Sequence, residues 1–317
     1  MIIGHKRQIA YLKEALKRGR LSHAYLFHGP DHVGKLTIAL SLAKALHCTQ
    51  RKGDQNNDWD CGRCSSCRLI ANGTHPHVLM LDTAHALVSK EEDRSEIPIQ
   101  DIRELKRLLA LAPEADKWRI AIINQADTMS EEASHAFLKI LEEPGERTLY
   151  VLVTSAPDLL LRTVLSRSTS LRFGLVSQED ISAFLQEKIR QPAKAAEIAA
   201  QAYGRPGLAI RMAEDEAYRN EVSAFRNKFE AALGNGIPGL LRLSQSASQD
   251  EELRERIIER SFAYLRGRLM DPHHHQGRLP ALAQAIRRMD SIATLLATTN
   301  VNTRLALDML LIQLAGL

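Results

Sequence analysis

The spacing of hydrophobic positions changes along the chain and divides it into two parts. In the first part, short apolar runs alternate with segments in which apolar residues recur every three or four positions. Runs of the first kind predict buried strands, and spacing of the second kind predicts amphipathic helices. Because strands that alternate with helices form a parallel sheet covered by helices, we expect an α/β core.

The elements expected in this core can be located from the pattern. The expected strands lie at 24–28, 78–82, 119–124, 148–154 and 167–173, and the expected helices at 5–18, 35–47, 99–109, 130–142 and 159–164. After residue 173 only helical spacing remains, which predicts helices at 177–190, 193–203 and 207–215 and longer ones up to residue 317. We therefore expect boundaries near 174–177 and near 210–220, which separate the core from a small helical domain and a final helical bundle.

The first expected strand is followed by a phosphate-loop pattern, Gly29-x4-Gly34-Lys35. In such loops the backbone N–H groups and the next helix N-terminus bind phosphates while the lysine neutralises their charge. The residue after the lysine should be a Ser or Thr that binds Mg²⁺, but it is Leu36, and Thr37 lies about 100° further around the helix. The sequence leaves two alternatives open: a degenerate phosphate site at Gly29, Gly34, Lys35 and Thr37, or a turn without a ligand.

The strand expected at 119–124 ends in two amides, Asn124 and Gln125, where an ATPase carries Asp and Glu. Hydrolysis needs one carboxylate near Mg²⁺ and another that orients or deprotonates water, and amides do neither. Asp127 falls in the turn before the next helix, where we expect a turn or capping role. We therefore expect no intrinsic ATP hydrolysis.

All four cysteines of the chain lie close together in the sequence, as Cys48-x12-Cys61-x2-Cys64-x2-Cys67. Four thiolates at this spacing predict tetrahedral Zn²⁺, with an iron–sulfur cluster as the alternative. Four cysteine ligands leave no open position for catalysis, so we expect a structural Zn²⁺ that folds an insertion at 48–68. Disulfides are not expected in a cytoplasmic protein.

Composition and charge narrow the function classes only slightly. With 317 residues, of which 44% are hydrophobic and 5% aromatic, the chain fits two or three helix-rich domains. The net charge of +4 does not by itself indicate nucleic-acid binding. No apolar run approaches the roughly 20 residues of a membrane span, and the N-terminus lacks a signal-peptide core, so we expect a cytoplasmic protein. The histidine run at 273–275 is expected in an exposed loop, with metal binding as the alternative.

Further segments carry a family resemblance: HAYLFHGP at 23–30, the cysteine insertion, GTHP at 73–76, SHAFLKILEEP at 134–144, SRS at 166–168 and NVNTRLALD at 300–308. Together they resemble the clamp-loader branch of the AAA+ superfamily, and within it the delta-prime family of bacterial DNA polymerase III. The similarity follows nearly the whole chain in the family's order. It departs at Ser168, where the family has cysteine.

The resemblance implies three domains. These are an AAA+ core at 1–174 with a zinc module at 48–68, a three-helix lid at 175–215, and a helical collar at 216–317 that joins a hetero-oligomeric ring. Arg167 corresponds to the arginine finger that reaches into a neighbour's ATP site, and Thr154 to the position that senses the γ-phosphate. The lid segment at 203–208 has no obvious arginine at the usual sensor position.

The function that the resemblance implies is that of a non-hydrolysing clamp-loader subunit of the DNA polymerase III holoenzyme. Its expected partners are the motor ATPase subunits and delta in the ring, the sliding clamp indirectly, and primed DNA through phosphate contacts, with no membrane. Zn²⁺ is the expected cofactor, and ATP binding is left open. The alternatives are an active ATPase subunit resembling gamma or tau, which would use Lys35, Thr37 and Asp127, and a zinc-dependent nucleic-acid-binding module. The second is disfavoured because the insertion carries few basic residues.

Overall fold

The computed structural model describes residues 2–50, 59–88, 94–111, 117–270, 279–299 and 301–315. It divides into two compact units, Met1–Ala213 and Glu214–Leu317. The division into core, lid and collar stays a prediction. The histidine run at 273–275 and most of the cysteine insertion's polar segment, 51–58, lie outside the described residues.

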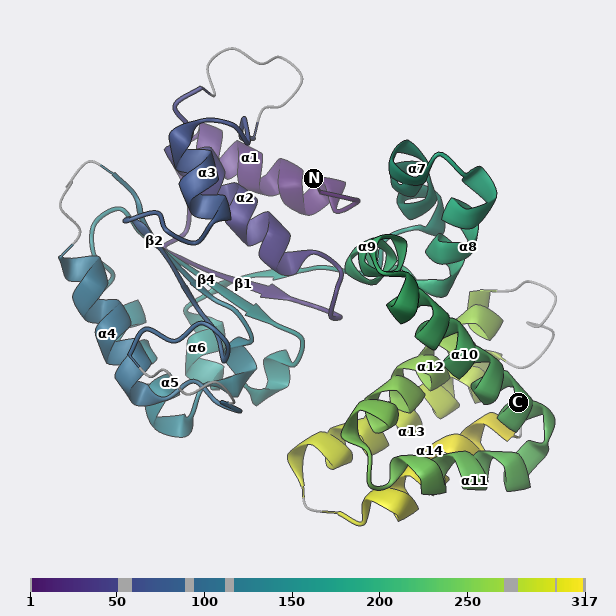
Figure 1. The fold of residues 1–317 in the computed structure, drawn as a ribbon. Helices are drawn as coiled ribbons and strands as arrows, with labels where there is room; N and C mark the ends of the chain where they lie inside the picture. Colours follow the sequence, from purple (N-terminus) through teal and green to yellow (C-terminus); the bar gives the residue numbers. More distant parts are fainter. Residues whose placement is uncertain are drawn as a thin grey trace. The chain divides into compact units, whose positions relative to one another are not determined.

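The first unit contains a five-stranded parallel sheet (Figure 1). Its strands, in the order β2-β3-β4-β1-β5, are β2 (Val78–Leu81), β3 (Arg119–Ile123), β4 (Thr148–Thr154), β1 (Ala24–His28) and β5 (Thr169–Arg172). Every neighbouring pair is parallel, which confirms the predicted α/β core. Because β1 lies directly beside β4, the phosphate loop that follows β1 and the polar residues that follow β4 share one edge of the sheet.

Alternating side chains of the strands supply two apolar layers, one on each face of the sheet. In β1, Tyr25 and Phe27 join one buried cluster, whereas Ala24 and Leu26 join the other. The helices whose residues join the first cluster are α1 (Lys6–Lys17), α2 (Lys35–His47) and α3 (Ser65–Ala71). Those that join the second are α4 (Ile99–Ala110), α5 (Glu131–Glu142) and α6 (Arg162–Ser166). Helices therefore cover both faces, as expected from the apolar pattern.

Several details differ from the sequence-based expectation. β2 ends one residue early at Leu81, β5 covers only Thr169–Arg172, and α6 covers Arg162–Ser166, so that Arg167 lies at the end of a helix and not in a strand. The strand β3 ends at Ile123, one residue early, and Gln125 adopts a left-handed conformation with φ 51°, which turns the chain away from the sheet. A helix that the pattern did not predict, α3 (Ser65–Ala71), follows the third cysteine. Seven residues make only two turns, too few to produce a helical period that stands out in the sequence.

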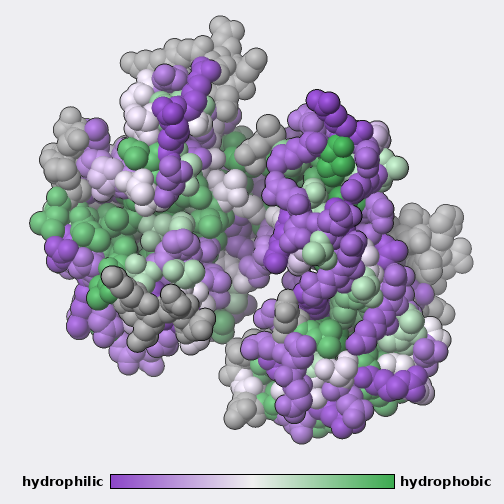
Figure 2. All heavy atoms as spheres, in the orientation of Figure 1, coloured by the Kyte–Doolittle hydropathy of each residue, from purple (hydrophilic) through white to green (hydrophobic). Residues whose placement is uncertain are grey.

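The rest of the described chain is helical, with no strand after Arg172 in the part that the structure describes. The first unit ends with α7 (Gln178–Ile189), α8 (Pro192–Gln201) and α9 (Pro206–Glu214). Over α7 and α8, hydrophilic side chains dominate the face seen in Figure 2, while Ile181, Leu185 and Ile198 are buried inside. These helices are thus amphipathic, as their spacing predicts.

The second unit is a helical bundle. Its described helices are α10 (Glu216–Gly234), α11 (Gly236–Ala247), α12 (Glu251–Met270), α13 (Leu279–Thr298) and α14 (Thr303–Ala315). They enclose one apolar core that includes Phe229, Leu240, Met289 and Leu311. Within the described ranges, none of the chain's helices combines the length and the apolar character that crossing a bilayer requires.

Candidate functional site

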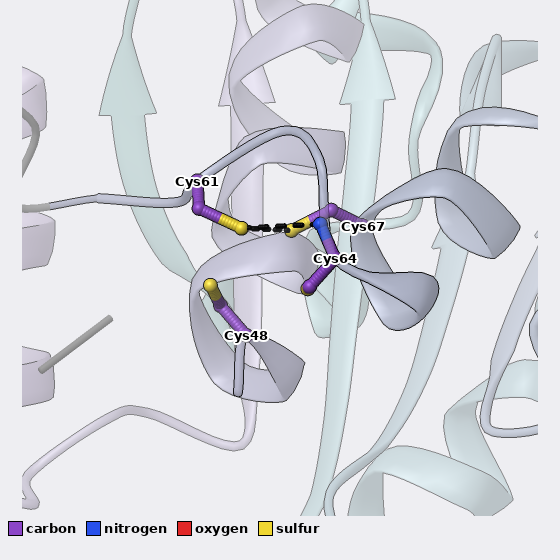
Figure 3. Close-up of side chains that lie close together, drawn as sticks. All are labelled: Cys48, Cys61, Cys64 and Cys67. Atoms are coloured by element: carbon purple, nitrogen blue, oxygen red, sulfur yellow. Dashed lines mark hydrogen bonds between the residues drawn. The ribbon is translucent and has the colours of Figure 1, made fainter. Parts of the chain in front are cut away.

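The four cysteines meet in space, although they come from different local structures. Cys48 immediately follows α2, Cys61 lies in a loop, Cys64 is the N-cap of α3, and Cys67 lies within α3 (Figure 3). Their sulfur atoms all lie within 4.8 Å of one another. Cys64 and Cys67 are buried, which excludes water from one side of the cluster.

The spacing of the sulfurs suits a metal and not a disulfide. The Sγ atoms of Cys61 and Cys67 are 4.0 Å apart, whereas a disulfide needs about 2.05 Å. A tetrahedral Zn²⁺ with Zn–S bonds of about 2.3 Å would place its sulfurs about 3.8 Å apart. The donor set therefore fits a metal ion, and its four soft thiolates favour Zn²⁺ or an iron–sulfur cluster over hard cations.

The local backbone stabilises the thiolate form of Cys64, whereas burial raises the pKa of Cys48 and of Cys67. The N–H of Cys64 donates to Sγ of Cys61 at 3.3 Å. Burial acts against a charge on Cys64 itself, but hydrogen bonds from the backbone of Cys67 and Thr49 and from the neighbouring thiols outweigh it and lower the pKa of Cys64 to about 6. Near neutral pH at least part of the cluster is thus ready to bind a cation.

The cysteine cluster is attached to the sheet by side chains that the sequence analysis did not single out. Trp59 and Ile70 are buried in the apolar cluster on the α2 face of the sheet. Beside Cys48, the ring of His47 lies 4.4 Å from that of His75, and burial together with the nearby histidines lowers the pKa of His47 to about 4. The sequence signal for this packing of uncharged histidine rings was the GTHP segment at 73–76, which contains His75.

Backbone carbonyl groups of the phosphate loop accept hydrogen bonds from the loop's own lysine, Lys35. Lys35 is buried, and its Nζ donates to the carbonyl oxygens of Gly29 at 2.5 Å and Pro30 at 2.7 Å, with a carboxylate oxygen of Asp31 at 3.6 Å. Burial lowers the pKa of Lys35, and the charge of Asp31 partly opposes this. The lysine amine is therefore hydrogen-bonded within the loop. Of the expected site residues, Gly34 is the N-cap of α2 and Lys35 its first residue, whereas Gly29 directly follows β1.

Elements on both sides of the loop press against it. The N–H of Gly207, in α9, donates to the carbonyl of His32 at 2.8 Å, and a Cβ at position 207 would lie 3.0 Å from that oxygen. Gly29 has φ 140°, and a Cβ there would lie 2.0 Å from the carbonyl of Phe173. Arg205 is near enough to lower the pKa of Lys35, a contact that the sequence analysis missed. The loop is thus enclosed by the end of β5 and the start of α9.

The amides after β3 bind the end of β2. Nδ2 of Asn124 donates to the buried carboxylate of Asp82 at 3.2 Å, and Oε1 of Gln125 accepts a hydrogen bond from Thr83 at 3.0 Å. Burial alone would raise the pKa of Asp82, but hydrogen bonds from His85 and Asn124 lower it overall. Sequence reasoning missed Asp82 because its partner lies 42 residues away in the chain.

Asp127 lies in a turn, as one of its two expected roles requires, but it does not cap α5. Ser130 caps α5 by accepting a hydrogen bond from the N–H of Ala133, whereas Asp127 lies in the short 3₁₀ turn before it. Its carboxylate accepts a hydrogen bond from the hydroxyl of Thr154 at the end of β4. It is also near enough to raise the pKa of Lys35. A carboxylate therefore does face the phosphate loop, although it does not come from the two expected positions.

Arg167 lies away from these contacts, at the C-terminal end of α6, with 39% of its side chain exposed. One guanidinium nitrogen lies 2.9 Å from Oε1 of Glu142, and another donates to the carbonyl of Thr163 at 3.3 Å. Ser168, which stands in place of the family's cysteine, donates to the carbonyl of Val164 at 2.9 Å. The guanidinium is accessible, and nothing in its own sequence neighbourhood buries it.

Comparison with known proteins shows the family to which the chain belongs. The family model described as "DNA polymerase III, delta subunit" matches residues 4–177, more than half of the chain. The chain belongs to this family. The matched range contains the five-stranded sheet, the cysteine cluster and the phosphate loop of this chain.

Individual relatives include more than one kind of DNA polymerase III subunit. The chain is 33% identical to the delta-prime subunit of Bacillus subtilis over 59% of this chain and 52% of that protein, and 31% identical to the tau subunit of the same organism over 57% of this chain and 30% of that protein. A solved gamma-subunit-related protein of Thermotoga maritima is 20% identical, with a TM-score of 0.40, over 96% of this chain and 99% of that chain. The chain thus covers about half or less of the curated relatives' length.

Proposed function

We propose that this member of the DNA polymerase III delta-subunit family is a clamp-loader subunit that does not hydrolyse ATP. The observation that carries the proposal is the pair of amides after β3. Asn124 and Gln125 stand where hydrolysis needs two carboxylates, and they are hydrogen-bonded to Asp82 and Thr83 at the end of β2. Leu36 at the Mg²⁺-binding position supports the same conclusion, because it has no hydroxyl to bind the metal.

In this proposal the subunit acts on a neighbour's ATP site through Arg167. The side chain is exposed at the end of α6, where a guanidinium can reach another protein surface. A fixed planar cation stabilises the charge that develops on the transferred phosphoryl group. An arginine finger contributes about 10³–10⁵ in rate, which equals roughly 4–7 kcal/mol of barrier.

The remaining parts are proposed to assemble and stabilise the subunit. Cys48, Cys61, Cys64 and Cys67 would hold a structural Zn²⁺ that fixes α3 against α2. Residues 1–174 would form the AAA+ core, 175–215 the lid, and 216–317 the collar that joins the motor subunits and delta in a ring. Contacts with the sliding clamp would be indirect, and those with primed DNA would reach only phosphates.

The alternative is an active ATPase subunit, as in gamma or tau. One observation favours it: the carboxylate of Asp127 accepts a hydrogen bond from Thr154 and lies close enough to raise the pKa of Lys35. The purified chain decides between the two when it is incubated with Mg²⁺-ATP. Turnover that Lys35→Ala abolishes would establish the alternative, whereas turnover at the buffer's background rate is expected from the proposal.

The trans-acting role is tested with Arg167→Ala in the reconstituted complex. We expect the complex to assemble normally, because the side chain is on the surface, and its ATPase activity to fall in the presence of clamp and primed DNA. Arg167→Lys is the matched variant, since it keeps the charge but lacks the planar fork. Normal assembly with unchanged stimulated ATPase activity in both variants would remove the finger assignment.

A further inference from the structure

The guanidinium of Arg167 is bound to a carboxylate at an unusual place. Glu142 is the last residue of α5, where the carbonyl ends of the helix already concentrate negative charge. A carboxylate at this position is unfavourable unless a cation lies beside it. Arg167 supplies that cation from 25 residues away in the sequence, at a nitrogen–oxygen distance of 2.9 Å.

The contact has a defined geometry and yet remains easy to break. The same guanidinium also donates to the carbonyl of Thr163, so that it connects the end of α5 to α6 in one orientation. The side chains of Arg167 and Glu142 are 39% and 51% exposed, so water can solvate both ions when they separate. Exposed pairs of this kind contribute only modestly and are screened by salt. A phosphate group offers the same guanidinium a stronger, bidentate partner.

We propose that Glu142 is a positioning residue that holds Arg167 in a parked orientation in the free subunit and releases it to the phosphate group of a neighbour's nucleotide. The proposal rests on the trans-acting role of Arg167 for its consequence in the ring, but the parking contact belongs to this chain alone. If the parked state is favoured to the extent typical of exposed pairs, only a minority of free subunits present an available guanidinium. Removing the carboxylate then raises the available fraction about two- to sixfold.

The chemical reactivity of the arginine tests the parking contact in the purified full chain. The rate at which a dicarbonyl reagent such as phenylglyoxal modifies Arg167 is followed by peptide mass spectrometry. We expect Glu142→Gln to increase that rate about two- to sixfold, and 1 M NaCl to bring the wild-type rate close to the variant's. Glu143→Gln is the matched control, because Glu143 is the neighbouring exposed carboxylate and makes no ion pair with the residues that the structure describes. Equal rates in wild type and Glu142→Gln would overturn the proposal.

The effect of Glu142→Gln on ATPase stimulation in the ring distinguishes a carboxylate that holds Arg167 back from one that only stabilises the fold. With parking, Glu142→Gln lowers the subunit concentration that gives half-maximal stimulation of ATPase activity about two- to sixfold and leaves the plateau unchanged. With a purely structural brace, the variant lowers the plateau or leaves both values unchanged, and either result contradicts the proposal. If Arg167→Ala does not affect the ring, the trans-acting role fails, but the reactivity measurement still decides whether Glu142 holds the arginine.

Discussion

Loss of one cysteine should release the metal and loosen a defined part of the fold. Cys67 is the ligand to change, because it is fully buried in α3 and its sulfur is 4.0 Å from that of Cys61. Structural Zn²⁺ sites contribute about 10–16 kcal/mol of apparent binding energy. Divided over four thiolates this is about 2.5–4 kcal/mol each, so Cys67→Ser should weaken metal affinity about 10²–10³-fold.

Fluorescence of Trp59 reports the structural effect. Trp59 is 4% exposed and packs in the same apolar cluster as Ile70 of α3. The chain has two tryptophans, so Trp118→Phe leaves Trp59 as the single indole probe. In that background we expect Cys67→Ser, or treatment of the parent with a strong chelator, to shift the Trp59 emission to longer wavelength. The sheet should persist, because its other face packs on α4, α5 and α6, which carry none of the four cysteines.

Two controls make the result decisive. Ser65→Ala changes an exposed residue at the start of α3 and should leave both zinc content and emission unchanged. Zinc content is measured by elemental analysis of the purified chain, and sheet integrity by circular dichroism. Stoichiometric zinc in Cys67→Ser with unchanged affinity would refute the four-cysteine site, and collapse of the entire first unit would refute the local role assigned to it.

Further predictions concern stability around the same sheet. Arg94→Met should lower the unfolding free energy by about 3–5 kcal/mol in urea titrations, because it leaves the fully buried Asp101 without its cation at 2.5 Å; Arg94→Lys should lose less, and equal stability of Arg94→Met and wild type would contradict the argument. The folded chain raises the pKa of Tyr150 to about 12 by burial, whereas the unfolded phenol ionises near 10. The folded state therefore keeps a proton that the unfolded state loses, and stability should fall by up to about 2.7 kcal/mol between pH 10 and 12 in wild type but not through this group in Tyr150→Phe; identical alkaline unfolding curves would refute it. Gly207→Ala should push α9 from the phosphate loop, since the new Cβ would be 3.0 Å from the carbonyl of His32; faster hydrogen exchange across residues 29–36 is expected, and unchanged exchange would show that the contact does not hold the loop.

The sequence predicted the features that local patterns encode. Apolar runs located β1, β2, β3 and β4 because these strands are mainly hydrophobic, whereas β5 is an edge strand of sequence TSLR with no fully buried residue. The Cys-x2-Cys spacing predicted that the sulfurs would meet, because Cys61, Cys64 and Cys67 are only three residues apart in the sequence, and metal binding by the cluster stays a prediction. The order of strand, glycine-containing loop and helix was predicted for the same reason, since these elements follow one another directly, and phosphate binding by the loop stays a prediction.

The contacts that the sequence did not predict join distant segments. Asp127 was expected as a turn or cap residue, but Thr154, which is 27 residues further along, holds its carboxylate. Glu142 and Arg167 each look like an ordinary surface charge until α5 and α6 pack and bring them together. The inward turn of Lys35 also depends on burial, which a loop motif does not encode. Such pairings are set by tertiary packing, and a single sequence carries no local period for them.

The proposed role places ATP hydrolysis in the neighbouring subunit and not in this chain. It is tested most directly by measuring clamp- and DNA-stimulated ATPase activity of the reconstituted ring with Lys35→Ala and Arg167→Ala introduced separately into this chain. We expect Lys35→Ala to leave the rate unchanged, whereas Arg167→Ala should slow hydrolysis at the adjacent site about 10³–10⁵-fold and so remove that site's share of the total rate. The opposite pattern, with loss of activity in Lys35→Ala and full activity in Arg167→Ala, would contradict it.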